Sequence, residues 1–185
     1  MTSSRLPAIF RMIFVVVALT LLAITKETHS LQDNNIARGG HVWQSSSLYK
    51  TSGPQRAIDG NRASHWGHGS CTHTKRDMKP WWRLDLQKMY KINTVTITNR
   101  KDCCHKRING AEIRIGDSLN DNGNANPRCT VIVSIRAGVS KTFACNGMTG
   151  RYVNIVIPGR QEYLTLCEVE VDGEEFNEDS SEIAC

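Results

Sequence analysis

Segments in which apolar and polar residues alternate recur along this chain, and they restrict the folds it can adopt. Alternation places every second side chain on one face of an extended strand, as in a sheet with one buried face. Strands are expected at residues 41–49, 81–86, 90–98, 111–115, 129–135, 141–145, 151–157 and 164–171. Eight or so short strands without an amphipathic helix predict an all-β sandwich or jelly roll, in which 129–135 and 141–145 form a pair.

Residues 1–30 are predicted to be a signal peptide. Arg5 and Arg11 precede an apolar run at 12–24 that is short for a membrane span, and the small residues Thr28 and Ser30 precede a possible cleavage site. Residues 31–172 are then expected to form one domain, secreted into an oxidising compartment. No second long apolar run follows, so membrane insertion is not expected.

The formal net charge of +5 is distributed unevenly along the chain. Acidic residues are concentrated from Asp172 onward, where Lys and Arg are absent, so residues 173–185 are expected to be a disordered acidic tail. Basic residues in the domain are scattered and form no long Lys/Arg run. A nucleic-acid partner is therefore not predicted.

Seven cysteines follow the predicted cleavage site, which in a secreted protein suggests three disulfides and one unpaired cysteine. The expected pairs are Cys71–Cys167, Cys129–Cys145 and Cys103–Cys104, with Cys185 alone in the tail. The first pair would close a long loop, and the second would join two neighbouring strands. Sequence alone does not prove this connectivity, and the adjacent cysteines could each pair elsewhere.

Residues 100–107, which read R-K-D-C-C-H-K-R, are a candidate ligand site. Arg100 and Arg107 enclose Asp102 and the two adjacent cysteines, and the segment follows an expected strand, so it should form a loop at a strand end. Two interpretations remain open from these residues. One is a basic surface turn with structural cysteines, and the other is a small polar pocket with a floor of sulfur atoms.

Residues 57–62, A-I-D-G-N-R, are a candidate site for a hard cation. Asp59 and Asn61 present side-chain oxygens at alternate positions. Ser70 and Glu168 could complete the shell, because a disulfide between the cysteines next to them would bring them together. Calcium prefers about six to eight such oxygens, and the alternative is an ordinary Asx turn at Asp59.

Zinc binding and catalysis are not favoured. The cluster of His65, His68, Cys71 and His73 matches no common zinc pattern, and its cysteine is expected in a disulfide. Neither a marked pair of carboxylates nor a nucleophile or phosphate-loop motif indicates an enzyme.

Several motifs occur together in one order: the run A-I-D-G-N-R, His73, W-W-R-L-D-L, Arg100-x-Asp102-x4-Arg107 around the adjacent cysteines, and C-E-V-E-V. In this combination residues 34–172 resemble the F-type lectins, or fucolectins. The resemblance implies a jelly-roll β-sandwich of discoidin-like type with long ligand-binding loops, a structural Ca²⁺ and a shallow pocket for L-fucose.

The resemblance also implies roles for individual residues. The fucose site would comprise the triad His73, Arg100 and Arg107, a Cys103–Cys104 disulfide against the sugar ring, and Leu48 and Trp66 near the methyl group. Asp102 would orient an arginine. The calcium ligands would be the side chains of Asp59, Asn61, Ser70 and Glu168 and the backbone carbonyls of Arg56 and Cys167.

The function expected from the resemblance is that of a secreted, calcium-dependent lectin without enzymatic activity. Its partners would be fucosylated glycans on microbial or host surfaces, in innate recognition. Such lectins commonly form homo-oligomers, often trimers, and weak single sites then gain from multivalency. The alternative is a discoidin-like domain that binds anionic lipid headgroups or a cell-surface protein.

Overall fold

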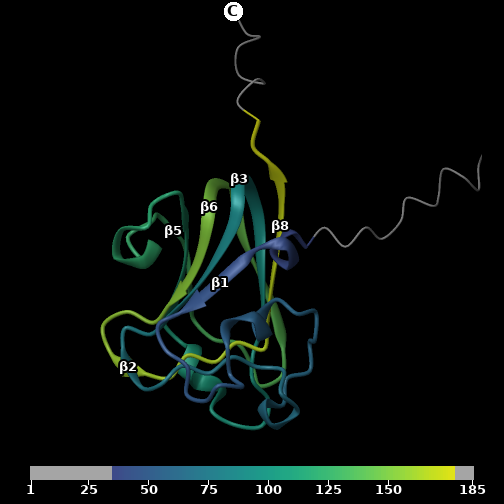
Figure 1. Ribbon diagram of the computed structural model, residues 1–185, viewed down its shortest axis with the longest axis vertical. Helices are drawn as coiled ribbons and strands as arrows, with labels where there is room; N and C mark the ends of the chain where they lie inside the picture. Colours follow the sequence, from purple (N-terminus) through teal and green to yellow (C-terminus); the bar gives the residue numbers. More distant parts are fainter. Residues whose placement is uncertain (1–34, 178–185) are drawn as a thin grey trace, which may run out of the picture. The chain divides into compact units, whose positions relative to one another are not determined.

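Two long antiparallel strands, β3 and β6, form the centre of the domain (Figure 1). The computed structural model describes Asn35–Asn177. The strands are β1 (His41–Gln44), β2 (Asp77–Met78), β3 (Trp81–Thr98), β4 (Ala111–Gly116), β5 (Arg128–Ile132), β6 (Ser140–Val156), β7 (Gln161–Glu162) and β8 (Glu168–Glu175). Short 3₁₀-helices lie between them: η1 (Ile36–Gly39), η2 (Pro54–Ala57), η3 (Trp66–His68), η4 (His105–Ile108) and η5 (Asn120–Gly123).

Both central strands contribute to two layers of sheet. The first part of β3 pairs with β1 and with the last part of β6, which continues to β4 and β5. The second part of β3 pairs with β8 and with the first part of β6. A break in register between Asp85 and Tyr90 separates the two parts, and Gln87 there has a left-handed φ of 68°. The all-β, jelly-roll-like fold expected from the alternating pattern is confirmed.

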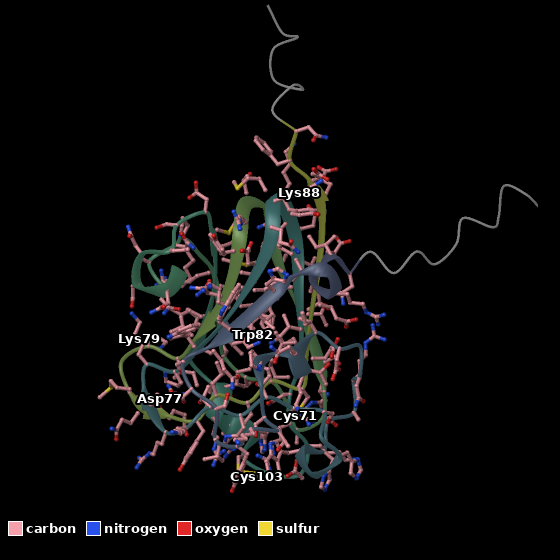
Figure 2. All side chains as sticks on the ribbon, viewed as in Figure 1. Cys71, Asp77, Lys79, Trp82, Lys88 and Cys103 are labelled. Atoms are coloured by element: carbon pink, nitrogen blue, oxygen red, sulfur yellow. A yellow bond between two sulfur atoms is a disulfide. The ribbon has the colours of Figure 1, made fainter. Side chains whose placement is uncertain are left out.

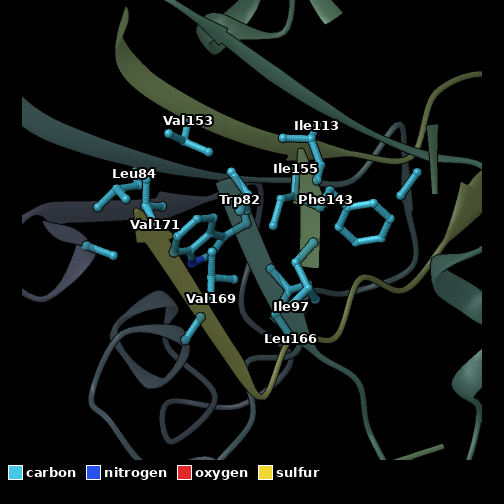
Figure 3. Close-up of a cluster of buried hydrophobic side chains, with 14 of the residues drawn as sticks. Trp82, Leu84, Ile97, Ile113, Phe143, Val153, Ile155, Leu166, Val169 and Val171 are labelled. Carbon is cyan, nitrogen blue, oxygen red and sulfur yellow. The ribbon is translucent and has the colours of Figure 1, made fainter. Parts of the chain in front are cut away.

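The core lies between these layers, where side chains from β3, β4, β6 and β8 pack together (Figure 3). Trp82 is fully buried, and its indole N–H donates a hydrogen bond to the carbonyl oxygen of Pro54 at 3.0 Å. Burying a large apolar side chain stabilises a fold by about 1.5–3 kcal/mol. Other fully buried members include Leu84, Ile97, Ile113, Ile155, Leu166 and Val169.

Several predicted strand bounds differ from the structure, and residues 133–135 and 164–167 lie outside the strands. Residues 81–86 and 90–98 belong to one strand, as do 141–145 and 151–157, because bulges bend these strands without ending them. The first strand ends at Gln44, since the hydroxyls of Ser45 and Ser46 leave the sheet to bind the Asp77 carboxylate.

The predicted pairing of 129–135 with 141–145 is wrong. Strand β5 pairs with β4, and the first part of β6 pairs with β3. The Cys129–Cys145 disulfide nevertheless forms, so it joins an edge strand to a strand with which it shares no ladder. Alternation identifies a strand but carries no information on which neighbour it pairs with.

Part of the predicted acidic tail belongs to a strand. Strand β8 continues through Glu175 and pairs with residues Tyr90–Ile92 of β3, so Gly173–Glu175 are strand rather than tail. The predicted signal peptide at 1–30 and residues 178–185 of the predicted tail, with Cys185, lie outside the described residues. Within Asn35–Asn177, no helix has the length and apolar content needed to cross a bilayer.

The sandwich gathers its long loops at one end. Figure 2 shows Cys71 and Cys103 at this end, whereas Lys88, in the middle of β3, lies at the opposite end of the sandwich. The loop end receives the segments that follow β1, β3 and β7, which carry the predicted site residues.

Candidate functional site

A cavity of about 260 Å³ opens at the loop end of the sandwich. Its size is near the lower limit for ligand pockets, which suits a small ligand such as one sugar ring. Three segments meet there. They are residues 48–49 after β1, residues 66–73, which begin with η3, and residues 100–107 after β3. The lining residues are Leu48, Tyr49, Trp66, His73, Arg100, Cys103 and Arg107.

His73 presents one ring nitrogen to the cavity. The residue is 5% exposed, and Nδ1 lies 2.7 Å from the carbonyl oxygen of Thr74, to which it donates. Burial lowers the pKa of His73, and the positive charges of Arg107 and Arg100 lower it further, against the effect of the Thr74 hydrogen bond. The imidazole is therefore neutral at pH 7, and Nε2 is a hydrogen-bond acceptor that lies 3.4 Å from Nη1 of Arg107.

Arg100 is fixed by a carboxylate two residues away. Its Nε donates to Oδ1 of Asp102 at 3.0 Å, and Nη2 donates to Oδ2 of the same residue. This guanidinium holds the pKa of Asp102 well below its usual range. Asp102 also accepts a hydrogen bond from the backbone N–H of Trp66 at 2.9 Å. The carboxylate thus joins the two loops and aligns Arg100, whose guanidinium carbon lies 5.3 Å from the Trp66 ring centroid.

Arg107 approaches the cavity from the short helix η4. Cys104 precedes this helix with a left-handed φ of 62°, and its carbonyl oxygen accepts a hydrogen bond from the Arg107 N–H at 3.0 Å. The guanidinium carbon lies 4.5 Å from the ring centroid of Tyr163, and Nε lies 3.7 Å from the Glu162 carboxylate. Arg160 binds the Arg107 carbonyl oxygen at 2.9 Å, which holds the backbone of the helix in place.

The cavity offers complementary groups for hydroxyls. Two guanidinium groups donate hydrogen bonds and stay charged, whereas neutral His73 accepts one. Trp66 and Leu48 add apolar surface, and the sulfur of Cys103 adds a further weakly polar patch. Such a set binds a ligand that has hydroxyls on one side and an apolar face on the other.

Six of the eight residues predicted for the fucose site line the cavity, and the other two contact residues that line it. Leu48, Trp66, His73, Arg100, Cys103 and Arg107 line the cavity. Asp102 and Cys104 instead support it, the first through Arg100 and the second through η4.

Sequence reasoning missed Tyr49, Tyr163 and Asn99. Tyr49 lines the cavity and packs against Trp66, with ring centroids 5.7 Å apart. Tyr163 contacts both His73 and Arg107. Buried Asn99 donates hydrogen bonds to the carbonyl oxygens of His105 and Ile135, which anchors the loop that carries both arginines. No periodic pattern marks these three positions.

The three expected disulfides are present, which are Cys71–Cys167, Cys103–Cys104 and Cys129–Cys145. Because Cys71 is in a disulfide, it has no thiolate with which to bind zinc beside the nearby histidines. Within Asn35–Asn177, no group of three or more His, Cys, Asp or Glu side chains is arranged for a metal ion.

One of the candidate calcium residues, Glu168, is a buried carboxylate. Glu168 is 1% exposed, and its Oε1 accepts a hydrogen bond from the Gly60 N–H at 3.0 Å. Among the described residues, its Oε2 has no hydrogen-bond donor. Burial, with the nearby Asp59 charge, raises the pKa of Glu168 to about 7. An unsatisfied buried carboxylate oxygen is the group that a hard cation would stabilise.

The remaining candidate ligands lie on the same segments. Ser70 is fully buried, and the Cys71–Cys167 disulfide links the residue after it to the residue before Glu168. Asp59 and Asn61 each use one side-chain oxygen to accept a local backbone N–H, in consecutive Asx turns. Oxygen lone pairs remain on both, so the donor set fits calcium by its chemistry.

Comparison with known proteins agrees with this architecture. A protein-family profile described as "NedA-like, galactose-binding domain" matches residues 56–155, more than half of the chain. Fucolectin-1 of Anguilla japonica is 45% identical over 167 residues, which cover 87% of this chain and 93% of that protein. The chain belongs to the fucolectin, or F-type lectin, family. The members of this family are binding proteins rather than enzymes.

Solved structures of related proteins share the fold. A fucolectin from striped bass (Morone saxatilis) serum is 60% identical, with a TM-score of 0.75 over 77% of this chain and 48% of that chain. A fucose binding module of Streptococcus pneumoniae is 35% identical, with a TM-score of 0.65 over 76% of this chain and 95% of that one. The chain also spans 39% of the Xenopus laevis pentraxin fusion protein, to which it is 43% identical over 165 residues, 85% of this chain. The bass lectin and the pentraxin fusion protein are therefore considerably longer than the shared domain.

Proposed function

We propose that this protein is a secreted, calcium-dependent lectin that binds L-fucose on glycoconjugates. The observation that carries the proposal is the convergence of His73, Arg100 and Arg107 on one cavity of about 260 Å³. The relatives named as fucolectins and a fucose binding module support fucose as the ligand.

The chemistry of the cavity accounts for selection of a 6-deoxy sugar. The ring oxygen and neighbouring hydroxyls accept hydrogen bonds from Arg100 and Arg107, and one hydroxyl donates to Nε2 of His73. Bonds with a charged partner are the stronger ones. The methyl group, which replaces a hydroxyl in fucose, occupies the apolar region beside Leu48 and Trp66, where a hydroxyl would lose its water without a partner.

A structural Ca²⁺ is part of the proposal. It would be held by the side-chain oxygens of Asp59, Asn61, Ser70 and Glu168 and by the backbone carbonyls of Arg56 and Cys167. The ion would neutralise the buried Glu168 carboxylate and fix the loops that follow η2 and η3. The burial of Glu168 and its unsatisfied Oε2 support this assignment.

Secretion, oligomerisation and a role in innate recognition of microbial glycans complete the proposal. Three disulfides in the described residues suit an oxidising compartment, and the bass relative comes from serum. A small, open cavity gives weak binding to one sugar. Assembly into homo-oligomers, by resemblance trimers, would raise avidity for arrays of fucose on a cell surface.

Calorimetric titration of L-fucose tests the proposal. The wild-type protein is expected to bind, and Arg100→Ala to lose about a hundredfold in affinity, because truncation removes a buried charged donor and leaves Asp102 unpaired. Arg151→Ala is a matched control, since Arg151 also pairs with an aspartate, Asp85, but on the sheet face. Failure of the wild type to bind L-fucose, or equal affinity in Arg100→Ala, would refute the proposal.

The alternative function, binding of anionic lipid headgroups, is tested by liposome sedimentation of the same protein. A discoidin-like lipid-binding domain would sediment with anionic liposomes in the presence of excess fucose. We expect no such sedimentation, because the charged groups that line the cavity are arranged for hydroxyls.

A further inference from the structure

A second cavity of about 210 Å³ adjoins the fucose site, and Trp66 lines both. The two cavities have similar sizes, so a sugar residue linked to fucose could occupy the second while fucose occupies the first. The lining residues of the second cavity are Thr51, Arg56, Trp66, Gly67, Gly69 and Cys71.

The side chain of Arg56 places a positive charge in this cavity. Its side chain is half-buried at the end of η2, and its guanidinium lies against the backbone of Gly69. A Cβ atom at Gly69 would come within 2.6 Å of Nη1, and the φ of +74° there also favours glycine. The absence of a side chain at position 69 therefore provides the space that the guanidinium occupies.

The charge of Arg56 is uncompensated. Across Asn35–Asn177, its guanidinium has no hydrogen-bond, ion-pair or aromatic partner. Arg100 and Arg107, in the neighbouring cavity, each have a carboxylate close by. A neutral sugar would use only part of the donor capacity of a free guanidinium, whereas a sulfate or carboxylate can accept two parallel hydrogen bonds from it.

We propose that the second cavity is a subsite for an anionic group on the sugar linked to fucose, with Arg56 as its binding residue. This inference rests on the proposed function, because fucose in the first cavity places the neighbouring sugar in the second. Thr51 is an exposed residue that lines this cavity, and its hydroxyl can add a hydrogen bond to the anion. Preferred ligands would therefore be sulfated or sialylated fucosyl oligosaccharides rather than neutral ones.

The test compares L-fucose, the Lewis a trisaccharide, its 3′-sulfated form and sialyl Lewis a by calorimetry on the full secreted chain in calcium. We expect at least one of the two anionic probes to bind about three- to fivefold more tightly than the neutral trisaccharide, a modest gain because Arg56 is partly exposed. The preference should shrink at high salt. The sulfated and sialylated probes separate a sulfate from a carboxylate as the group that is bound.

Arg56→Gln is expected to abolish this preference and to leave L-fucose affinity unchanged. Because only the backbone carbonyl of Arg56 is a proposed calcium ligand, melting in calcium should also be unchanged. Arg76→Gln, which alters an exposed arginine before β2, is the matched control and should keep the preference. Equal affinity for neutral and both anionic probes, or a preference that persists in Arg56→Gln, overturns the subsite while fucose binding stands. Absence of L-fucose binding overturns the proposed function and, with it, the subsite.

Discussion

The strands of this domain, here called the strand body, and the loops at its loop end are stabilised by different interactions. The body is a continuous apolar core, in which large side chains such as Trp82, Leu84 and Ile155 are fully buried. The loop end is held by a few specific links: two disulfides, the Arg100–Asp102 pair and the contacts of Glu168. Core packing is shared among many contacts, whereas each loop link acts alone and can be removed separately.

This difference implies that stability and binding can be changed independently. Changes in the body, and loss of the ion proposed for the loops, should lower stability, whereas changes at the cavity should weaken binding while the sandwich persists. The following predictions test that separation, beginning with the largest expected effect.

Trp82→Ala should lower the free energy of unfolding by about 3–5 kcal/mol, because it leaves a cavity in the core and removes the hydrogen bond to Pro54. Denaturant titration followed by far-UV circular dichroism measures the change. Trp43→Ala is the control, since Trp43 is 43% exposed on β1 and its loss should cost far less. Similar losses in both variants would show that the core does not carry the stability.

Calcium removal should lower the melting temperature of the wild type by on the order of 10 °C, because an ion at about a hundred times its Kd adds about 3 kcal/mol. Glu168→Gln should melt at the same temperature with calcium or EDTA. Glu170→Gln is the control: Glu170 pairs with Arg62 outside the proposed shell, so calcium dependence should persist. A wild-type melting curve that is insensitive to EDTA would contradict the calcium site.

The Cys103→Ser/Cys104→Ser double variant should bind fucose about tenfold more weakly, since it removes a cavity wall and frees the backbone before η4. Its melting temperature should change little, because the bond closes almost no loop. Cys129→Ser/Cys145→Ser should show the opposite pattern, with about 3 kcal/mol less stability and unchanged affinity, because that disulfide closes a separation of 16 residues. Parallel losses of affinity and stability in both variants would contradict the separation.

Fucose affinity should be constant above pH 6.5 and fall at lower pH. Burial lowers the pKa of His73, so the folded state binds this proton less readily than the unfolded state. The contribution of His73 to stability and binding is therefore fully present above the unfolded pKa and lost as pH falls below it. Calorimetry across this range measures the effect, and His68→Gln should keep the same midpoint. A midpoint above 6.5 would contradict a neutral acceptor at Nε2.

The positions of the strands were largely predictable from sequence, but which strands pair with each other was not. Val95 and Ile97 alternate with polar residues, and this local pattern is sufficient to place a strand. The partner of residues 141–145 depends on long-range contacts, and the expected hairpin with 129–135 is absent from the described sheet. The Cys129–Cys145 pairing was correct although the ladder proposed for it was not.

The residues that line the cavity were predicted most clearly where a motif with fixed spacing carried the signal. His73, Arg100 and Arg107 were found through a motif and do meet at one cavity. Tyr163 was missed, because its position against Arg107 is set by the path of the segment between β7 and β8. Tyr49 was missed although Leu48 beside it was found, since the direction of a side chain on an irregular loop does not follow a period.

A crystal structure of the protein with L-fucose and calcium tests the central claim most directly. We predict one fucose in the cavity, with both guanidinium groups and Nε2 of His73 within 3.2 Å of its oxygens and its methyl group beside Trp66. Fucose bound at another surface would contradict the account, as would fucose bound in this cavity without contact to Arg100 and Arg107.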